Sequence, residues 1–198
     1  MSVEPVTRWI VCIAGWQQNE GQTTGLEELQ DRLHRRCSNR STRVVLRAWN
    51  DSPSHIAERI FRRRPNDGQP AVVIIGYSYG GYSAVLLARQ LQRRGIEVET
   101  MLLCDAVWRP SRWCPSVLSL LPWWTLRVPG NVRRLYSWRQ KTNKPSGHAI
   151  ALEDTSTLWS TRSVVGTTHR YMDENPEFVS ISIAKGCPEK QRKLETFQ

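Results

Sequence analysis

The stretch that decides the fold runs Ala71-Val-Val-Ile-Ile-Gly-Tyr-Ser-Tyr-Gly-Gly81. Its first five residues are apolar and mostly β-branched, which is typical of a strand buried on both faces of a parallel sheet. Apolar residues then recur at helical spacing: Ala84, Leu87, Ala88 and Leu91. The pattern predicts a strand, a tight turn centred on Ser78, and a helix that ends before Gly95.

The same alternation of strands and helices continues on both sides of this stretch. Predicted strands cover residues 9–15, 43–49, 71–75, 98–104 and 132–139. Predicted helices begin near Thr24, Ser52, Gly81 and Asn175. Residues 106–130 and 140–168 show no clear period. We therefore expect an α/β fold, a doubly wound and mainly parallel sheet of five or six strands with helices on both faces.

The simplest order of such a sheet places the second strand outside the first and the third strand on the other side of the first. A ligand is then expected beyond the carboxyl ends of the first and third strands.

Length, charge and cysteine content indicate a globular protein without a zinc site. The chain has 198 residues, 39% of them hydrophobic, and a net charge of +10, which predicts a single globular domain over 1–198 with a polar tail over 186–198. Five cysteines without a CxxC pair indicate a reduced chain with no zinc site. With no visible signal peptide or membrane span, we expect a cytoplasmic location.

The turn at Ser78 has the form Gly-x-Ser-x-Gly, directly after a strand and before a helix. This context is typical of a nucleophile elbow, in which small residues at Gly76 and Gly80 let strand and helix pass closely. The competing interpretation is a glycine-rich turn that binds phosphate, but no Gly-Lys-Ser/Thr follows.

A serine needs a base to take its proton. Two of the four histidines, His34 and His55, precede Ser78 and lie on predicted helices. His169 lies in a loop just before the last helix, and is the favoured base. His148, in another loop, stays as the alternative.

Asp105 closes the strand after the elbow, so its carboxylate should lie beside Ser78 and is the favoured partner of the base. Asp154 and Asp173 are rivals, and Asp105 could instead cap a loop or pair with Arg109. The oxyanion hole is expected from the backbone N–H of Tyr79 and that of Trp16 or Gln17.

Taken together, these motifs resemble the α/β-hydrolase superfamily, in the chain order Ser, Asp, His. The segment 128–140 is similar to small bacterial or phage lipase- or thioesterase-like members. The resemblance implies a serine hydrolase that cleaves a carboxylic ester or thioester through an acyl-enzyme, with no cofactor and no metal. The chain departs from the pattern because it lacks a His-Gly-Gly-Gly loop, room for a full cap domain, and an acid soon after residues 136–140.

Residues 107–130 are rich in Trp and Leu and form a candidate lid or substrate cover, or a loop packed over the sheet edge. Trp108 and Trp113 in it, with Tyr77, are the candidate substrate-binding residues, although Tyr77 and Tyr79 could also merely pack beside the serine. The basic surface could draw the protein to anionic lipid. No dedicated nucleic-acid motif is present. The alternative function is a non-catalytic hydrolase scaffold that acts as a basic binding module for nucleic acid or anionic lipid.

Overall fold

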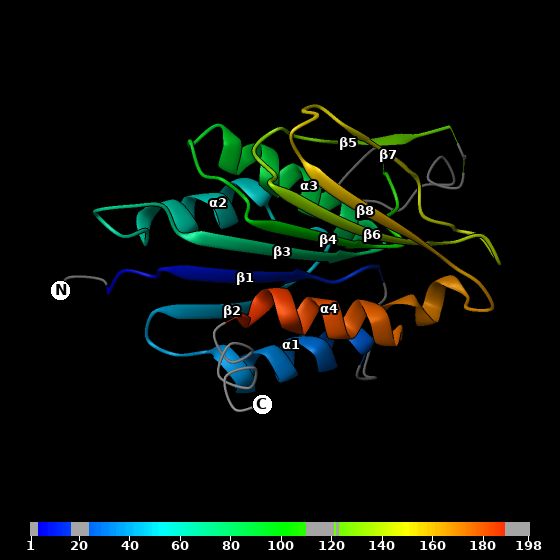
Figure 1. Cartoon of the computed structure of the whole chain (residues 1–198), viewed down its shortest axis with the longest axis horizontal. Coiled ribbons are helices and arrows are strands. Elements are labelled where there is room, and N and C mark those ends of the chain that lie inside the picture. Colours follow the sequence, from blue (N-terminus) through cyan, green and yellow to red (C-terminus); the bar gives the residue numbers. More distant parts are fainter. Residues whose placement is uncertain (1–3, 17–23, 110–120, 122, 189–198) are drawn as a thin grey trace.

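A computed structural model describes residues 4–16, 24–109, 121 and 123–188 of the chain (Figure 1). Its main sheet has six strands, all paired in parallel, in the order β2-β1-β3-β4-β6-β8. These strands are β1 (Arg8–Ile13), β2 (Thr42–Arg47), β3 (Ala71–Tyr77), β4 (Thr100–Cys104), β6 (Arg134–Gln140) and β8 (Leu158–Val164). A separate parallel pair joins β5 (Thr125–Val128) to β7 (Ala149–Leu152). The predicted fold class and the predicted order of the first three strands are confirmed.

Helices cover both faces of the sheet. One face carries α2 (Pro53–Arg62) and α3 (Tyr79–Gln92), and the other carries α1 (Gly25–Cys37) and α4 (Pro176–Gly186) (Figure 1). Each face has its own buried apolar cluster, and β3 lies between them with its central side chains fully buried. This explains the continuous apolar run of β3, since both of its faces are covered.

Local sequence signals set the helix starts. Thr24 accepts the N–H of Glu27 while the Glu27 carboxylate accepts the N–H of Thr24, so the predicted capping box is present. Asn175 caps α4 by accepting the N–H of Phe178, with Pro176 in the first turn.

Three strands, β5, β7 and β8, fall in segments where the sequence showed no period. The 3₁₀ helix η2 (His169–Glu174) lies between these segments and α4 and was not predicted. The edge strand β8 is mostly exposed along its length, so it lacks the buried apolar run that marks β3. None of the helices in the described part of the chain has the length and apolarity needed to span a bilayer.

The expectation of a reduced chain is wrong for two cysteines. Cys37, the last residue of α1, forms a disulfide with Cys187, just past α4. Cys12 and Cys104 are buried free thiols. Cys187 falls within the predicted polar tail and is 8% exposed; residues 189–198 lie outside the described part.

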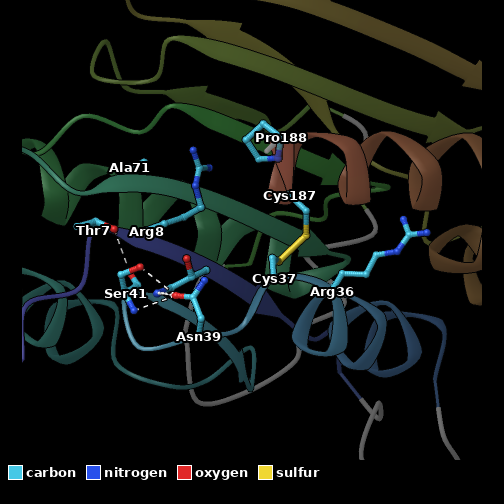
Figure 2. A pocket seen from close by; sticks show the side chains of 11 residues that line it. Thr7, Arg8, Arg36, Cys37, Asn39, Ser41, Ala71, Cys187 and Pro188 are labelled. Atoms are coloured by element: carbon cyan, nitrogen blue, oxygen red, sulfur yellow. Dashed lines mark hydrogen bonds between the residues drawn. A yellow bond between two sulfur atoms is a disulfide. The ribbon is translucent and has the colours of Figure 1, made fainter. Parts of the chain in front are cut away.

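A pocket of about 270 Å³ opens beside this disulfide (Figure 2). Its lining includes Thr7 and Arg8 at the start of β1 and Ala71 at the start of β3. The pocket therefore lies at the amino edge of the sheet. Ser78 follows the carboxyl end of β3, so this pocket and Ser78 are at opposite edges.

The disulfide closes a loop with a sequence separation of 150 residues. We expect its reduction to lower the free energy of unfolding by about 2–4 kcal/mol, because the unfolded chain regains the freedom that the cross-link removed. Urea unfolding with and without dithiothreitol measures this. The variant Cys187→Ser is the control and should be insensitive to the reductant. Equal unfolding midpoints for the wild type in both conditions would contradict the prediction.

Candidate active site

Ser78 stands between the end of β3 and the start of α3 in a conformation that L-residues rarely adopt, with φ 54° and ψ −125°. Its backbone is held on both sides. Its N–H donates to the carbonyl of Cys104 at 3.0 Å, and its own carbonyl accepts the N–H groups of Gly81 and Val107 at 3.0 and 2.9 Å. Neighbouring segments thus over-determine the turn, which is how a strained serine persists in a native structure.

The glycines around Ser78 are required by close backbone approach. A Cβ on Gly76 would lie 2.8 Å from the carbonyl oxygen of Gly80, and a Cβ on Gly80 would meet the backbone of Ile13. The spacing Gly-x-Ser-x-Gly is therefore the local sequence that this strand–turn–helix allows.

Ser78, His169 and Asp105 form one hydrogen-bonded chain. His169 Nε2 lies 2.8 Å from Ser78 Oγ, and His169 Nδ1 lies 2.6 Å from Asp105 Oδ2. A carboxylate only accepts, so the ring carries its proton on Nδ1 and its Nε2 accepts the serine hydroxyl. The structure brings together the three residues favoured from the sequence.

The carboxylate of Asp105 is fully buried and is satisfied by several donors. Its Oδ1 accepts the N–H groups of Gln140 at 3.1 Å and Gly147 at 2.7 Å, and its Oδ2 accepts Gln140 Nε2 at 2.9 Å. A Cβ on Gly147 would lie 2.6 Å from Oδ1, so glycine is needed there. Sequence reasoning missed Gln140, which ends β6 where an acid was noted as lacking.

Besides Asp105, residues from two segments position His169. The Tyr77 ring stacks on the imidazole with centroids 5.3 Å apart, and the Tyr77 hydroxyl donates to the His169 carbonyl at 2.5 Å. The His169 N–H donates to Asn143 Oδ1 at 2.8 Å. Burial raises the pKa of Tyr77, so its hydroxyl keeps the proton it donates. Tyr77, a predicted substrate-binding residue, thus packs against the imidazole of His169.

Two segments predicted to supply oxyanion donors, the start of α3 and the loop after β1, adjoin Ser78. Tyr79 is the first residue of α3, so its backbone N–H cannot bond to a carbonyl of its own helix. A Cβ on Gly15 would lie 2.8 Å from Ser78 Cβ, which shows how closely the loop after β1 approaches the elbow. Trp16 follows in that loop, and Gln17 lies outside the described residues.

The rival histidine and carboxylates lie elsewhere. His148 is buried, with Nδ1 accepting the N–H of Trp108 at 2.9 Å and Nε2 donating to the carbonyl of Leu121 at 2.9 Å. Asp173 is buried and accepts the N–H of Leu26 at 3.0 Å. Asp154 accepts the N–H of Ser156 in an exposed turn. The structure assigns each of these rivals other partners.

The segment predicted as a cover is described only in part. Trp108 stacks on Trp124 with centroids 3.8 Å apart, and its ring is 6.2 Å from that of Tyr82 on α3, so this part of the segment packs against α3. Trp113 lies outside the described residues. The described residues contain no group of three or more His, Cys, Asp or Glu side chains placed to hold a metal ion.

No family model matches the chain, and no curated protein matches it. Solved structures do match. The chain is similar to ClbQ from the colibactin NRPS/PKS pathway, at 11% identity and a TM-score of 0.50, over 97% of this chain and 100% of that one. The chain has an α/β-hydrolase fold. A thioesterase, RedJ of the prodiginine biosynthetic pathway in Streptomyces coelicolor, also matches, at 11% identity and a TM-score of 0.48, over 94% of this chain and 89% of that one.

The buried ring of His148 makes stability depend on pH. Desolvation lowers the pKa of His148 below its usual 6.5, and the charge of Arg139 acts in the same direction while Asp105 opposes it. The unfolded chain therefore binds this proton more tightly, so stability falls as the pH falls below about 6.5. We expect His148→Gln to lose less stability than the wild type between pH 7.5 and 5.

Unfolding free energies measured at several pH values test this expectation. The exposed His55 provides the control, and His55→Gln should keep the wild-type pH dependence. If the free energies of unfolding of the wild type and of His148→Gln change equally with pH, the His148 ring does not contribute to the pH dependence.

Proposed function

We propose that the protein is a serine hydrolase that cleaves an acyl ester or thioester through an acyl-enzyme on Ser78. The observation that carries the proposal is the continuous hydrogen-bonded chain from Ser78 Oγ through His169 to Asp105. A fold does not by itself imply a reaction, so the proposal rests on this site.

The geometry supports a two-step acyl transfer. His169 Nε2 takes the hydroxyl proton while Ser78 Oγ attacks the carbonyl carbon, forming a tetrahedral oxyanion. The carbon–oxygen or carbon–sulfur bond then breaks, and the leaving group departs with the proton from Nε2. Water next gives a proton to His169 and attacks the acyl-enzyme. The acid is released, and Ser78 recovers its proton.

Three features lower the barrier of these steps. Asp105 fixes the Nδ1–H tautomer and stabilises the imidazolium, in a site where burial strengthens the attraction. The Tyr79 N–H at the start of α3 and the N–H of Trp16 are the proposed oxyanion donors. Ser78 is 7% exposed, so its hydroxyl meets little bulk water. All steps use groups of this chain and water.

The alternative, a non-catalytic basic binding module, draws on the surface arginines. Arg59 on α2 has its pKa lowered by burial and by the charges of Arg47, Arg63 and Arg43. None of these four forms an ion pair within the described residues. This cluster could bind an anionic surface, but it does not account for the Ser78–His169–Asp105 chain.

We expect Ser78→Ala to lower kcat for a p-nitrophenyl ester or an N-acetylcysteamine thioester by about 10⁴-fold or more, because no other group replaces the nucleophile. The exposed Ser180 supplies the matched control, and Ser180→Ala should keep wild-type kcat. Steady-state hydrolysis measures both. If Ser78→Ala retains full activity, Ser78 is not the nucleophile. If the wild type cleaves neither compound but binds anionic vesicles, the binding module is favoured.

We expect Asp105→Asn to lower kcat by about 10⁴-fold, because the asparagine amide favours the wrong imidazole tautomer. The fold should persist, since the remaining side-chain carbonyl still accepts the N–H groups of Gln140 and Gly147. Asp154→Asn, in an exposed turn, is the control and should leave kcat unchanged. An active and folded Asp105→Asn enzyme would overturn the role of this carboxylate.

A further inference from the structure

Three aromatic side chains gather at the carboxyl edge of the sheet on one side of Ser78. Trp16 follows β1, Trp49 follows β2, and Tyr79 follows Ser78 itself. The Tyr79 ring lies 6.4 Å from that of Trp16 and 5.6 Å from that of Trp49, centroid to centroid. The side chain of Trp49 was not among the site residues favoured from the sequence.

A buried arginine fixes the position of Trp49 in this group. Arg109, which is 1% exposed, donates through Nη2 to the Trp49 carbonyl at 2.5 Å and to Ser83 Oγ at 2.7 Å. Its guanidinium carbon lies 4.8 Å from the centre of the Trp49 ring. A ring fixed in this way loses little rotamer entropy when it binds a ligand.

Trp16 presents an apolar surface beside the nucleophile. Its side chain is 48% exposed, although Gly15, one residue earlier, closely approaches Ser78 Cβ. An exposed aromatic ring on the loop that approaches Ser78 is placed to contact a substrate.

The sheet order decides which part of a substrate meets these rings. The leaving group takes its proton from His169 Nε2, and His169 is held by Asp105 at the end of β4. Trp16 and Trp49 extend from β1 and β2, across β3 from β4. The acyl group, on the other side of the carbonyl from the leaving group, therefore extends toward the rings.

We propose that the side chains of Trp16, Trp49 and Tyr79 form an acyl subsite for a flat apolar group, an aryl ring or a conjugated chain. The inference rests on the proposed function and adds the substrate class. Aromatic rings gain from offset or edge contacts with another ring beyond the area they bury. A saturated chain of similar size gains only from burial, so the subsite discriminates between the two.

Two sulfonyl fluorides test the subsite without knowledge of the natural substrate. Phenylmethanesulfonyl fluoride and 1-hexanesulfonyl fluoride share a reactive group and differ in an aryl or alkyl substituent of similar size. The rate constant for sulfonylation of Ser78 by each is measured by intact mass, followed by peptide mapping. For each protein, the rate constant for the aryl reagent is divided by that for the alkyl reagent. Dividing this ratio for a variant by the ratio for the wild type removes the difference in intrinsic reactivity between the two reagents.

We expect the ratio to fall about fivefold in Trp49→Leu and in Trp16→Leu, since leucine keeps an apolar surface but removes the ring. Trp16→Leu changes an exposed side chain and keeps the test valid if Trp49→Leu unfolds. Trp159→Leu on β8 is the control, because Trp159 is 46% exposed and lies at the far edge of the sheet. It should keep the wild-type ratio.

The outcomes separate the inference from the proposed function. Modification of Ser78 with an unchanged ratio in both Trp16→Leu and Trp49→Leu overturns the aromatic subsite alone. Absence of any adduct on Ser78 in the folded wild type overturns the proposed function, and the subsite with it.

Discussion

The backbone of Ser78 is the constraint on which the rest of the site depends. The residue takes a positive φ because β3 and α3 meet at it, with Gly76 and Gly80 in close contact with neighbouring backbone. Hydrogen bonds from Ser78 to Cys104 and from Val107 to Ser78 tie the turn to β4 and to the chain beyond it. The same contacts bring Asp105, the next residue after β4, beside the serine. The nucleophile and the acid are therefore positioned by one piece of local structure.

The histidine reaches this place through long-range contacts. Beyond His169, the helix η2 is fixed because Asp173 accepts the N–H of Leu26 and the Met172 carbonyl accepts Cys104 Sγ–H at 3.1 Å. The α4 helix that follows is joined to α1 by the disulfide of Cys187. The η2 helix and α4 are thus anchored on α1 and β4, and this anchoring holds His169 between Tyr77 and Asp105.

Sequence patterns predicted the parts of the molecule whose signals are local. The β3–turn–α3 unit has a buried apolar run and a glycine spacing, and the strand order follows from right-handed crossovers. Gln140, Asn143 and the side chain of Trp49 carry no such signal, because their contacts with Asp105, His169 and Tyr79 join residues far apart in the chain. The edge strand β8 lacks an apolar run because little of it is buried. The disulfide joins α1 to the end of α4 across 150 residues, a pairing that spacing alone does not indicate.

The central claim is that Ser78 is activated by His169. Labelling the folded protein with a fluorophosphonate, followed by peptide mapping, tests it most directly, because only an activated serine reacts quickly with this group. We expect one adduct, on Ser78, and we expect it to be lost in His169→Ala. An adduct of equal yield in His169→Ala, or none on the folded wild type, would contradict it.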